Sequence, residues 1–273
     1  MIVDLHTHST ASDGVLTPAE LVAQALAAGV ELMALTDHDT MAGCESAAAA
    51  ARDTPLELLA GIELSTLWRG RTIHILGIGI DPGASALRAH CQALCAQRIA
   101  RTEAIGERLT RRARLPGREL ARTVLEENPL PTRAHLARAL VAQGHARSIS
   151  DAFARLLGPG SAGHIADDWP AIETTMALLR DAGGNAVIAH PSRYRLSAGA
   201  LRSLLGEFAK AGGAAIESDN SDAERCARLA GDAGLALSLG SDFHDPQIKW
   251  NRLGRFDKLA PGTRSLARQI ARC

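Results

Sequence analysis

The sequence has few aromatic residues, no long apolar run and no net charge, and each absence excludes a class of protein. Aromatic side chains make up 3% of its 273 residues, so extended base-stacking surfaces for nucleic acid are not expected. No apolar run is long enough to cross a bilayer, and the first residues, MIVDLHTHS, lack the basic start of a signal peptide. With 30 basic and 30 acidic residues, broad electrostatic binding to duplex nucleic acid or to membranes is not expected either. We therefore expect a soluble, cytoplasmic protein.

Cysteine usage excludes further chemistries. None of the five cysteines stands in a CxxC pair, so we expect free thiols rather than disulfides or a zinc ribbon. These residues are Cys44, Cys91, Cys95, Cys226 and Cys273. The chain also shows no internal repeat and no motif for a covalent Ser, Cys or Asp nucleophile.

The first part of the chain predicts alternating strands and helices. Short apolar runs end in polar residues in IVDLHTHS, LMALTDHD and TIHILGIGI, with Ala- and Leu-rich stretches between them. Residues 18–29 should form a helix, with Thr17 as its cap, Pro18 first, Glu20 in the first turn and Gly29 at the end. A second helix is expected at 43–52. Such alternation predicts a parallel sheet with crossover connections.

Residues 84–155 carry a different pattern, which is helical and rich in Ala and Arg, with breaks at 115–117 and 128–131. Strand signals return in NAVIAHP, AAIESDN and ALSLGSDFH, and we expect helices at 172–182, 199–211, 223–233 and 263–271. The sequence thus predicts an α/β catalytic domain at 1–83 and 166–273, and a helical insertion subdomain at 84–165. The basic bias of the insertion suits either an anionic substrate or a solvated helix face.

Metal-ligand residue types gather where the apolar runs end. Because functional side chains collect at the carboxyl ends of parallel strands, we expect these residues to converge. Imidazole and carboxylate together suit Zn, Mn or Fe, and so many ligands predict two or three ions. Five histidines and two carboxylates follow such runs, and one more histidine lies within a run: His6, His8, His38, His190 and His244; Glu63 and Asp242; and His74.

Two pairs of these residues each project to one face of a strand. His6 and His8 are separated by one residue on a strand and project to the same side, as do Asp242 and His244. Asp4 lies on the same face as the first pair and is a candidate acceptor for an imidazole N–H.

Taken alone, several residues have an ordinary structural explanation. Asp13 stands in an ASDG turn, where Asp-Gly is common. His74 suits a buried core histidine, and Asp39 or Thr40 is expected to cap the following helix. Adjacent strand residues point opposite ways, so Asp37 should not be a ligand equivalent to its neighbour in LTDHDT.

The blocks DLHTHSTASDG, LTDHDT, GIEL, HILG, AHP and GSDFH resemble, in order, the signature blocks of the polymerase-and-histidinol-phosphatase (PHP) family, over residues 1–81 and 183–246. The resemblance implies a distorted (β/α)7 barrel with up to three metal ions at its carboxyl-end mouth. It divides nine ligands into three sites, the first two bridged by Glu63: His6, His8, Glu63 and Asp242; Glu63, His74 and His190; and Asp13, His38 and His244.

The family resemblance also implies a mechanism. Clustered divalent ions, with Mn expected first and Fe, Zn or Mg as alternatives, would neutralise a phosphate while a metal-bridging hydroxide attacks it. The expected catalytic residues are Asp13, His38, Glu63, Asp242 and His244. Neither metal identity nor oligomeric state is readable from the sequence.

Two arginines are candidate phosphate ligands, because guanidinium pairs with phosphate in a bidentate manner. Arg193 follows AHP in HPSRY, and Arg133 starts a helix in PTRAHLARALV with His135 beside it. These stretches and the insertion resemble stand-alone PHP phosphoesterases that remove the 3′-phosphate of 3′,5′-nucleotide bisphosphates, with relatives that trim short RNA from the 5′ end. Ser161 departs from that pattern, which has a Lys there.

Three other functions remain open. Histidinol-phosphate phosphatase would use the same metal ligands, although the insertion and Arg133 favour a nucleotide. A 5′–3′ exoribonuclease acting on short RNA would use the same site, with Tyr194 or Trp250 stacking one base. An inactive PHP module serving as a scaffold is the alternative outside enzymes, but it should have lost ligands.

Overall fold

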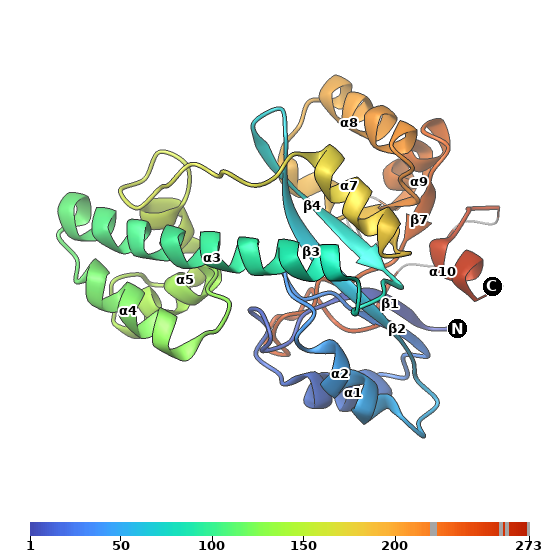
Figure 1. Ribbon diagram of the computed structural model, residues 1–273, viewed down its shortest axis with the longest axis horizontal. Helices are drawn as coiled ribbons and strands as arrows, with labels where there is room; N and C mark the ends of the chain where they lie inside the picture. Colours follow the sequence, from blue (N-terminus) through green and yellow to red (C-terminus); the bar gives the residue numbers. More distant parts are fainter. Residues whose placement is uncertain (219–222, 257–258, 260–261, 272–273) are drawn as a thin grey trace. The chain divides into compact units, whose positions relative to one another are not determined.

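The apolar runs of the sequence form a seven-stranded sheet whose strands follow one another in chain order (Figure 1). The structure, a computed structural model, describes residues 1–218, 223–256, 259 and 262–271. Asp219 and Asn220 of the predicted AAIESDN strand, and Cys273, lie outside these residues. The strands are β1 (Val3–Thr7), β2 (Leu32–Leu35), β3 (Glu57–Trp68), β4 (Arg71–Ile78), β5 (Asn185–Ile188), β6 (Ala215–Glu217) and β7 (Ala236–Ser238).

The sheet is mixed, so the prediction of a parallel sheet was wrong at its centre. β1, β2 and β3 are parallel, as are β5, β6 and β7, but β4 is antiparallel to both β3 and β5. The chain reverses at Arg69 and Gly70, whose φ angles are 49° and 73°, and two such residues make the tight turn of a hairpin. β3 therefore continues through Glu63 to Trp68, whereas the sequence suggested that the strand ended at Glu63.

The sheet closes on itself beyond β7. The N–H of Leu5 donates to the carbonyl of Leu239 at 2.8 Å, and that of His8 to Phe243 at 2.9 Å. In return, the N–H of Asp242 donates to the carbonyl of His6 at 2.9 Å. The first strand thus pairs with the segment after the last one, which gives the distorted seven-stranded α/β barrel that the sequence predicted.

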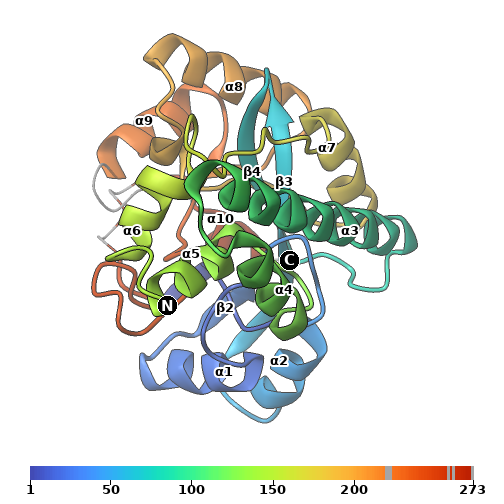
Figure 2. The same ribbon diagram turned by 90° about the vertical axis from the view of Figure 1, so that its left-hand side faces the viewer.

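The barrel helices begin and end close to the predicted residues. Thr17 caps α1 (Pro18–Ala27), and Thr17 and Glu20 form a reciprocal capping box. In Figures 1 and 2, α1 and α2 lie together on one side of the sheet, and α8 and α9 lie on the other. The remaining barrel helices are α2 (Cys44–Ala51), α7 (Ile172–Asp181), the 3₁₀ helix η3 (Pro191–Tyr194), α8 (Ala198–Lys210), α9 (Ala223–Asp232) and α10 (Leu266–Ile270).

The predicted cap of α2 was wrong. The residue before this helix is Gly43, and no side chain caps it. Asp39 instead accepts the backbone N–H of Ser65 at 2.7 Å, and so ties the end of β2 to β3. Thr40 accepts a backbone N–H within its own turn. Both side chains therefore hold the loop that carries His38.

By contacts, the chain divides into two compact units, Met1–Arg88 with Trp169–Cys273, and Ala89–Asp168. The second unit is helical and covers nearly the range expected for an insertion. Its helices are α3 (Ser85–Arg108, the first residues of which belong to the barrel unit), the π-helix η1 (Leu109–Ala113), α4 (Gly117–Glu127), α5 (Arg133–Ala142), α6 (Ile149–Ala152) and the π-helix η2 (Phe153–Leu157).

Helices α3 and α4 lie against each other (Figure 2), and their close packing depends on two glycines. A Cβ on Gly117 would lie 2.3 Å from the carbonyl oxygen of Gly106, so neither residue can carry a side chain without moving the helices apart. Buried Leu109, Leu120 and Leu136 fill the core beside this crossing. Among the described residues, no helix combines the length and apolar character needed to span a bilayer.

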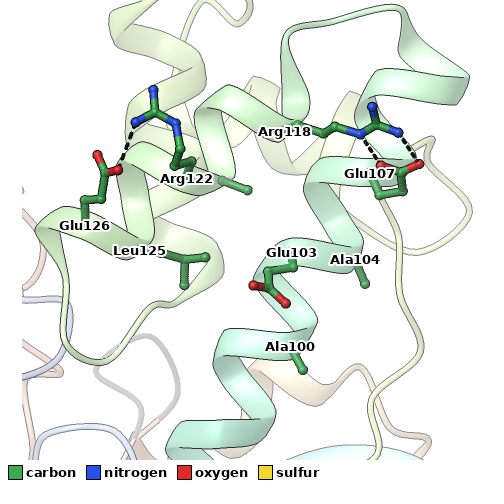
Figure 3. A pocket seen from close by; sticks show the side chains of 9 residues that line it. Ala100, Glu103, Ala104, Glu107, Arg118, Arg122, Leu125 and Glu126 are labelled. Carbon is green, nitrogen blue, oxygen red and sulfur yellow. Dashed lines mark hydrogen bonds and ion pairs between the residues drawn. The ribbon is translucent and has the colours of Figure 1, made fainter.

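A groove of about 680 Å³ lies between α3 and α4 (Figure 3). Alanines form much of its floor, and its rim is charged. The rim charges pair with one another: Arg118 donates to Glu107 at 2.8 Å, and Arg122 to Glu126 at 2.8 Å. This groove carries none of the residues singled out from the sequence.

Candidate metal centre

Glu63 lies at the centre of the predicted ligands. It sits in the middle of β3 with no exposed surface, although a glutamate at a strand end would usually face solvent. β4 pairs beside it, with His74 opposite Ser65, so Glu63 and His74 are diagonal neighbours on one face of the hairpin. The two carboxylate oxygens lie within 3.2 Å of five imidazole nitrogens: Oε1 is near His74 and His190, and Oε2 is near His6, His8 and His38.

Asp242 and Asp13 complete the cluster on its other side. Asp242 Oδ1 lies 3.3 Å from His6 Nε2 and 3.2 Å from His8 Nε2. Asp13 Oδ1 lies 3.2 Å from His244 Nε2. The structure therefore brings all nine residues named from the sequence into one cluster, which we call the nine-residue cluster.

Three subsets of this cluster have ligand atoms close enough to share an ion, within 4.8 Å of one another. The subset of His6, His8, Glu63 and Asp242 corresponds to a set implied by the family resemblance. The subset around Asp13 uses His8 again, and the subset around His74 uses His38 and Glu63 again. His190 belongs to none of the three, although its Nε2 is 3.0 Å from Glu63 Oε1. The subsets are His6, His8, Glu63 and Asp242; His8, Asp13, His38 and His244; and His38, Glu63 and His74.

The donor atoms fit divalent metal ions. His6 Nδ1 donates to Glu217 Oε1 at 2.8 Å, and His244 Nδ1 donates to the carbonyl of Asp242 at 2.9 Å. In a neutral ring the other nitrogen, Nε2, then carries a lone pair, and both Nε2 atoms point into the cluster. His6 Nε2 also lies 3.0 Å from His8 Nε2. Lone pairs and carboxylate oxygens crowded together in a buried site are the environment that a divalent ion stabilises.

Burial and charge set the protonation of the cluster. Burial raises the pKa of Glu63, but the imidazoles of His38 and His6 outweigh it and hold that pKa well below its usual range. Burial lowers the pKa of His8, yet its hydrogen bonds to Asp242 and Glu63 raise it to about 10. Glu63 is therefore ionised, and a metal ion bound at His8 would displace a proton from its ring.

Glu217 is the residue that sequence reasoning missed. It ends β6, is buried, and binds His6 through Oε1, while its Oε2 accepts the backbone N–H of His190 at 2.6 Å. The sequence suggested Asp4 for this task, and that was wrong. Asp4 accepts backbone N–H groups of Ser241 and Gly254, at 2.9 Å each, and so fastens the barrel closure. A carboxylate ending an apolar run, as in AAIE, is the signal that could have found Glu217.

Asp37 is not at the metal cluster, in agreement with the sequence. Its oxygens accept the N–H of Ser9 at 2.8 Å, the hydroxyl of Ser9 at 2.7 Å and that of Ser12 at 2.6 Å. It thereby holds the turn that presents Asp13.

Arg193 reaches the cluster from η3. Its guanidinium forms an ion pair with Asp242 and remains half exposed. Tyr194 is turned the other way: its hydroxyl donates to the carbonyl of Ala189 at 2.7 Å and accepts the N–H of His74 at 2.9 Å, so its role is to brace a ligand strand. Trp250 is exposed over 80% of its surface.

In the helical unit, Arg133 is the first residue of α5 and His135 belongs to its cap. His135 Nδ1 accepts the N–H of Thr132 at 3.1 Å, which leaves Nε2 as the protonated nitrogen of the neutral ring. Ser161 is bound within its own turn, donating to the carbonyl of Gly158 at 2.7 Å.

Two further arginines of this unit were not singled out from the sequence. Burial and the charges of Arg133 and Arg98 together lower the pKa of Arg101 to about 10, against the opposing effect of Asp167. The three guanidinium groups of Arg98, Arg101 and Arg133 thus lie close enough to interact electrostatically, and Arg101 forms an ion pair with Asp167.

A closed α/β barrel with imidazole and carboxylate groups clustered around a buried glutamate is the arrangement of a metal-dependent hydrolase. The family model of the PHP domain matches residues 4–157. The chain belongs to the PHP domain family.

Known relatives match nearly the whole chain. A Haemophilus influenzae protein described as a 5′-3′ exoribonuclease is 40% identical over 257 residues, covering 92% of this chain and 93% of the relative. A Chromobacterium violaceum 3′,5′-nucleoside bisphosphate phosphatase is 36% identical over 273 residues, covering 98% and 96%.

A solved structure is also similar over its full length. It is a Chromobacterium violaceum protein described as an amidohydrolase, with bound sulfate and no metal, and it has 35% sequence identity and a TM-score of 0.92. The match covers 100% of this chain and 96% of that one. The fold described above is therefore also found in a solved structure that matches this chain along its whole length.

Proposed function

We propose that this protein is a cytoplasmic, metal-dependent phosphomonoesterase that removes the 3′-phosphate of 3′,5′-nucleotide bisphosphates, for example converting adenosine 3′,5′-bisphosphate to AMP. The observation that carries the proposal is the nine-residue cluster around buried Glu63. When bound there, two or three divalent ions, Mn foremost, would supply a water of lowered pKa and neutralise phosphate charge. The similarity to the Chromobacterium violaceum phosphatase supports the choice of substrate.

The residues of the chain would then act in three ways. The nine side chains would hold the ions, with Glu63 between the first and second and Asp13, His38 and His244 around the third. Glu217 would keep His6 in the tautomer whose Nε2 faces inward. Arg193 would turn from Asp242 toward a phosphate oxygen, because its guanidinium is already at the cluster and half exposed.

Phosphate release by the metal-loaded protein tests the proposal. We expect turnover of adenosine 3′,5′-bisphosphate and little from histidinol phosphate; the opposite preference would contradict it. Arg193→Ala should lower kcat/KM by about ten- to a hundredfold with metal content unchanged, since a hydrogen bond to a charged group is worth about 1.5–3 kcal/mol. Arg202→Ala, an exposed arginine on α8, is the control.

A second activity, 5′–3′ hydrolysis of short RNA, is favoured because it breaks the same type of bond as removal of a 3′-phosphate. Removing a 3′-phosphate and releasing the first nucleotide of a 5′-phosphorylated RNA break the same bond, between phosphorus and O3′. The only difference is whether the departing phosphate carries a further nucleotide. The similarity to the Haemophilus influenzae exoribonuclease supports this candidate.

For the helical unit, we propose that Arg133 and His135 contact the substrate. The guanidinium of Arg133, which lies near that of Arg101, and the N–H at His135 Nε2 have the chemistry to bind an anion. Arg133→Ala should raise KM without changing metal content. The control is Arg122→Ala, which should leave KM unchanged because the Arg122 guanidinium is paired with Glu126.

Elemental analysis tests the alternative that the protein is an inactive scaffold. A purified protein that contains no divalent metal and stays inactive with added Mn²⁺ would favour that alternative.

A further inference from the structure

A second pocket adjoins the metal cluster through the 3₁₀ helix η3. It has a volume of about 260 Å³ and lies between η3 and the first turns of α8 and α9. η3 follows directly on the ligand His190, and it sends Arg193 to Asp242 while Pro191 and Ser192 line the pocket. Because consecutive Cα atoms are about 3.8 Å apart, the wall formed by these two residues begins within about 8 Å of the His190 backbone.

The pocket has an apolar interior and a cationic rim. The interior is formed by three leucines, Leu196, Leu201 and Leu229. The rim carries Arg195 and Arg225. Both arginines are exposed. Among the residues that the structure describes, none accepts a hydrogen bond from the Arg195 side chain, so its guanidinium is available to a ligand.

The size of the pocket suits part of a ligand. Sites for whole small molecules have volumes of about 300–1,000 Å³, and this pocket is smaller. A single nucleobase, flat and apolar on its faces, fits between leucines, and guanidinium groups stack on bases and pair with phosphates.

We propose that this pocket is a subsite for the nucleotide that follows the scissile phosphate of a short RNA, with Arg195 and Arg225 as its specificity-determining residues. The inference rests on the second proposed activity, 5′–3′ hydrolysis of short RNA. In the reaction, water adds its oxygen to phosphorus, the bond from phosphorus to O3′ breaks, and O3′ leaves with a proton. The phosphate then stays on the 5′ oxygen of the following nucleotide. That nucleotide must lie beside the cluster, on the side of the phosphate. A 3′,5′-bisphosphate has no such nucleotide and leaves the pocket empty.

The two substrates separate the subsite from the reaction centre. For Arg195→Ala and Arg225→Ala, we expect kcat/KM for the 5′-phosphorylated dinucleotide pApA to fall about tenfold or more, by the usual worth of a stacked base. Hydrolysis of adenosine 3′,5′-bisphosphate should stay within about twofold. Arg228→Ala, on the same helix but outside the pocket, is the matched control. Equal losses on both substrates, or no loss on pApA, would overturn the proposal.

A second measurement needs no variant. Wild-type protein should cleave a dinucleotide with an abasic second position about tenfold less efficiently than pApA; equal rates would overturn the subsite. A protein that hydrolyses the bisphosphate but not pApA would overturn the subsite and leave the phosphatase proposal standing. One that cleaves pApA but releases no phosphate from the bisphosphate would contradict the proposed function alone.

Discussion

Substitution of Glu217 by Gln tests how the second layer of the metal centre works. In the wild type, one oxygen accepts the His6 Nδ1–H at 2.8 Å and the other accepts the His190 N–H at 2.6 Å. Gln has only one oxygen, so its amide group must face one of these donors. Either a hydrogen bond is lost, or His6 changes tautomer, accepts from the amide and places its proton on Nε2. That proton would occupy the lone pair needed by a metal.

The expected loss of Mn²⁺ affinity in Glu217→Gln is of similar size whether the hydrogen bond is lost or His6 changes tautomer. A hydrogen bond to a charged group is worth about 1.5–3 kcal/mol, which is about ten- to a hundredfold in an equilibrium constant. Loss of partners that orient metal-bound histidines costs about 10–100-fold in affinity or activity. We therefore expect the affinity of Glu217→Gln for Mn²⁺ to fall by that factor, with kcat recovering as Mn²⁺ is raised.

Chelator competition measures the affinity, and phosphate release at increasing Mn²⁺ measures the recovery. Glu224→Gln, an acid on α9 that is exposed over 91% of its side chain, is the matched control. Thermal melting in the presence of EDTA separates positioning from folding, because a positioning role leaves the metal-free melting temperature nearly unchanged. Wild-type Mn²⁺ affinity in Glu217→Gln would refute the reasoning.

Three further results are expected. Adding Mn²⁺ at a hundred times its dissociation constant should stabilise the chelator-treated protein by about 2.7 kcal/mol, measured by denaturant unfolding; an unchanged midpoint would contradict metal binding by the folded state. Gly240→Ala should weaken Mn²⁺ binding in a chelator titration, because its Cβ would lie 2.2 Å from Glu217 Oε1 and 2.4 Å from His6 Cβ. Hydrogen bonds from Arg118 lower the pKa of Glu107 to about 2. Since this folded-state pKa lies below the ordinary one, the stabilisation is present above about pH 4.5 and is lost as the pH falls toward 2. A carboxyl NMR titration should show that midpoint, and Arg118→Ala should return it toward the ordinary value.

The convergence of most of the nine residues was predictable because they stand where apolar runs end, whereas Asp13 was named only through the family resemblance. His6 and His8 share a strand face, and Asp242 ends an apolar run, so the rule that strand ends meet was enough to bring them together. Helix α1 was equally local, since Thr17 and Glu20 form its cap within four residues of chain.

The centre of the sheet was not predictable by the same means. The hairpin between β3 and β4 turns on Arg69 and Gly70, whereas the strongest sequence signals for such a turn are Asn-Gly and Asp-Gly. Without that turn, Glu63 reads as the end of a parallel strand. Its burial follows only from the neighbouring strand β4, which covers it and supplies His74.

Asp4 was given the role that Glu217 has in the structure for a related reason. Both are carboxylates on strands beside the cluster, and strand periodicity alone places Asp4 on the face of His6. The choice between them depends on barrel closure, which brings Ser241 and Gly254 to Asp4 and occupies its oxygens with backbone N–H groups. Contacts across more than 200 residues of chain have no counterpart in a local pattern.

The same closure explains why metal binding should depend on the whole barrel. β1 carries His6 and His8, and its backbone is hydrogen-bonded to the segment that carries Asp242 and His244. Glu217 then ties His6 to the ligand His190 through its two oxygens. The family match at residues 4–157 contains neither Glu217 nor the last three ligands. The geometry of the nine-residue cluster therefore depends on the closure that joins the first strand to the segment after the last one, whereas local motifs supply only its residues.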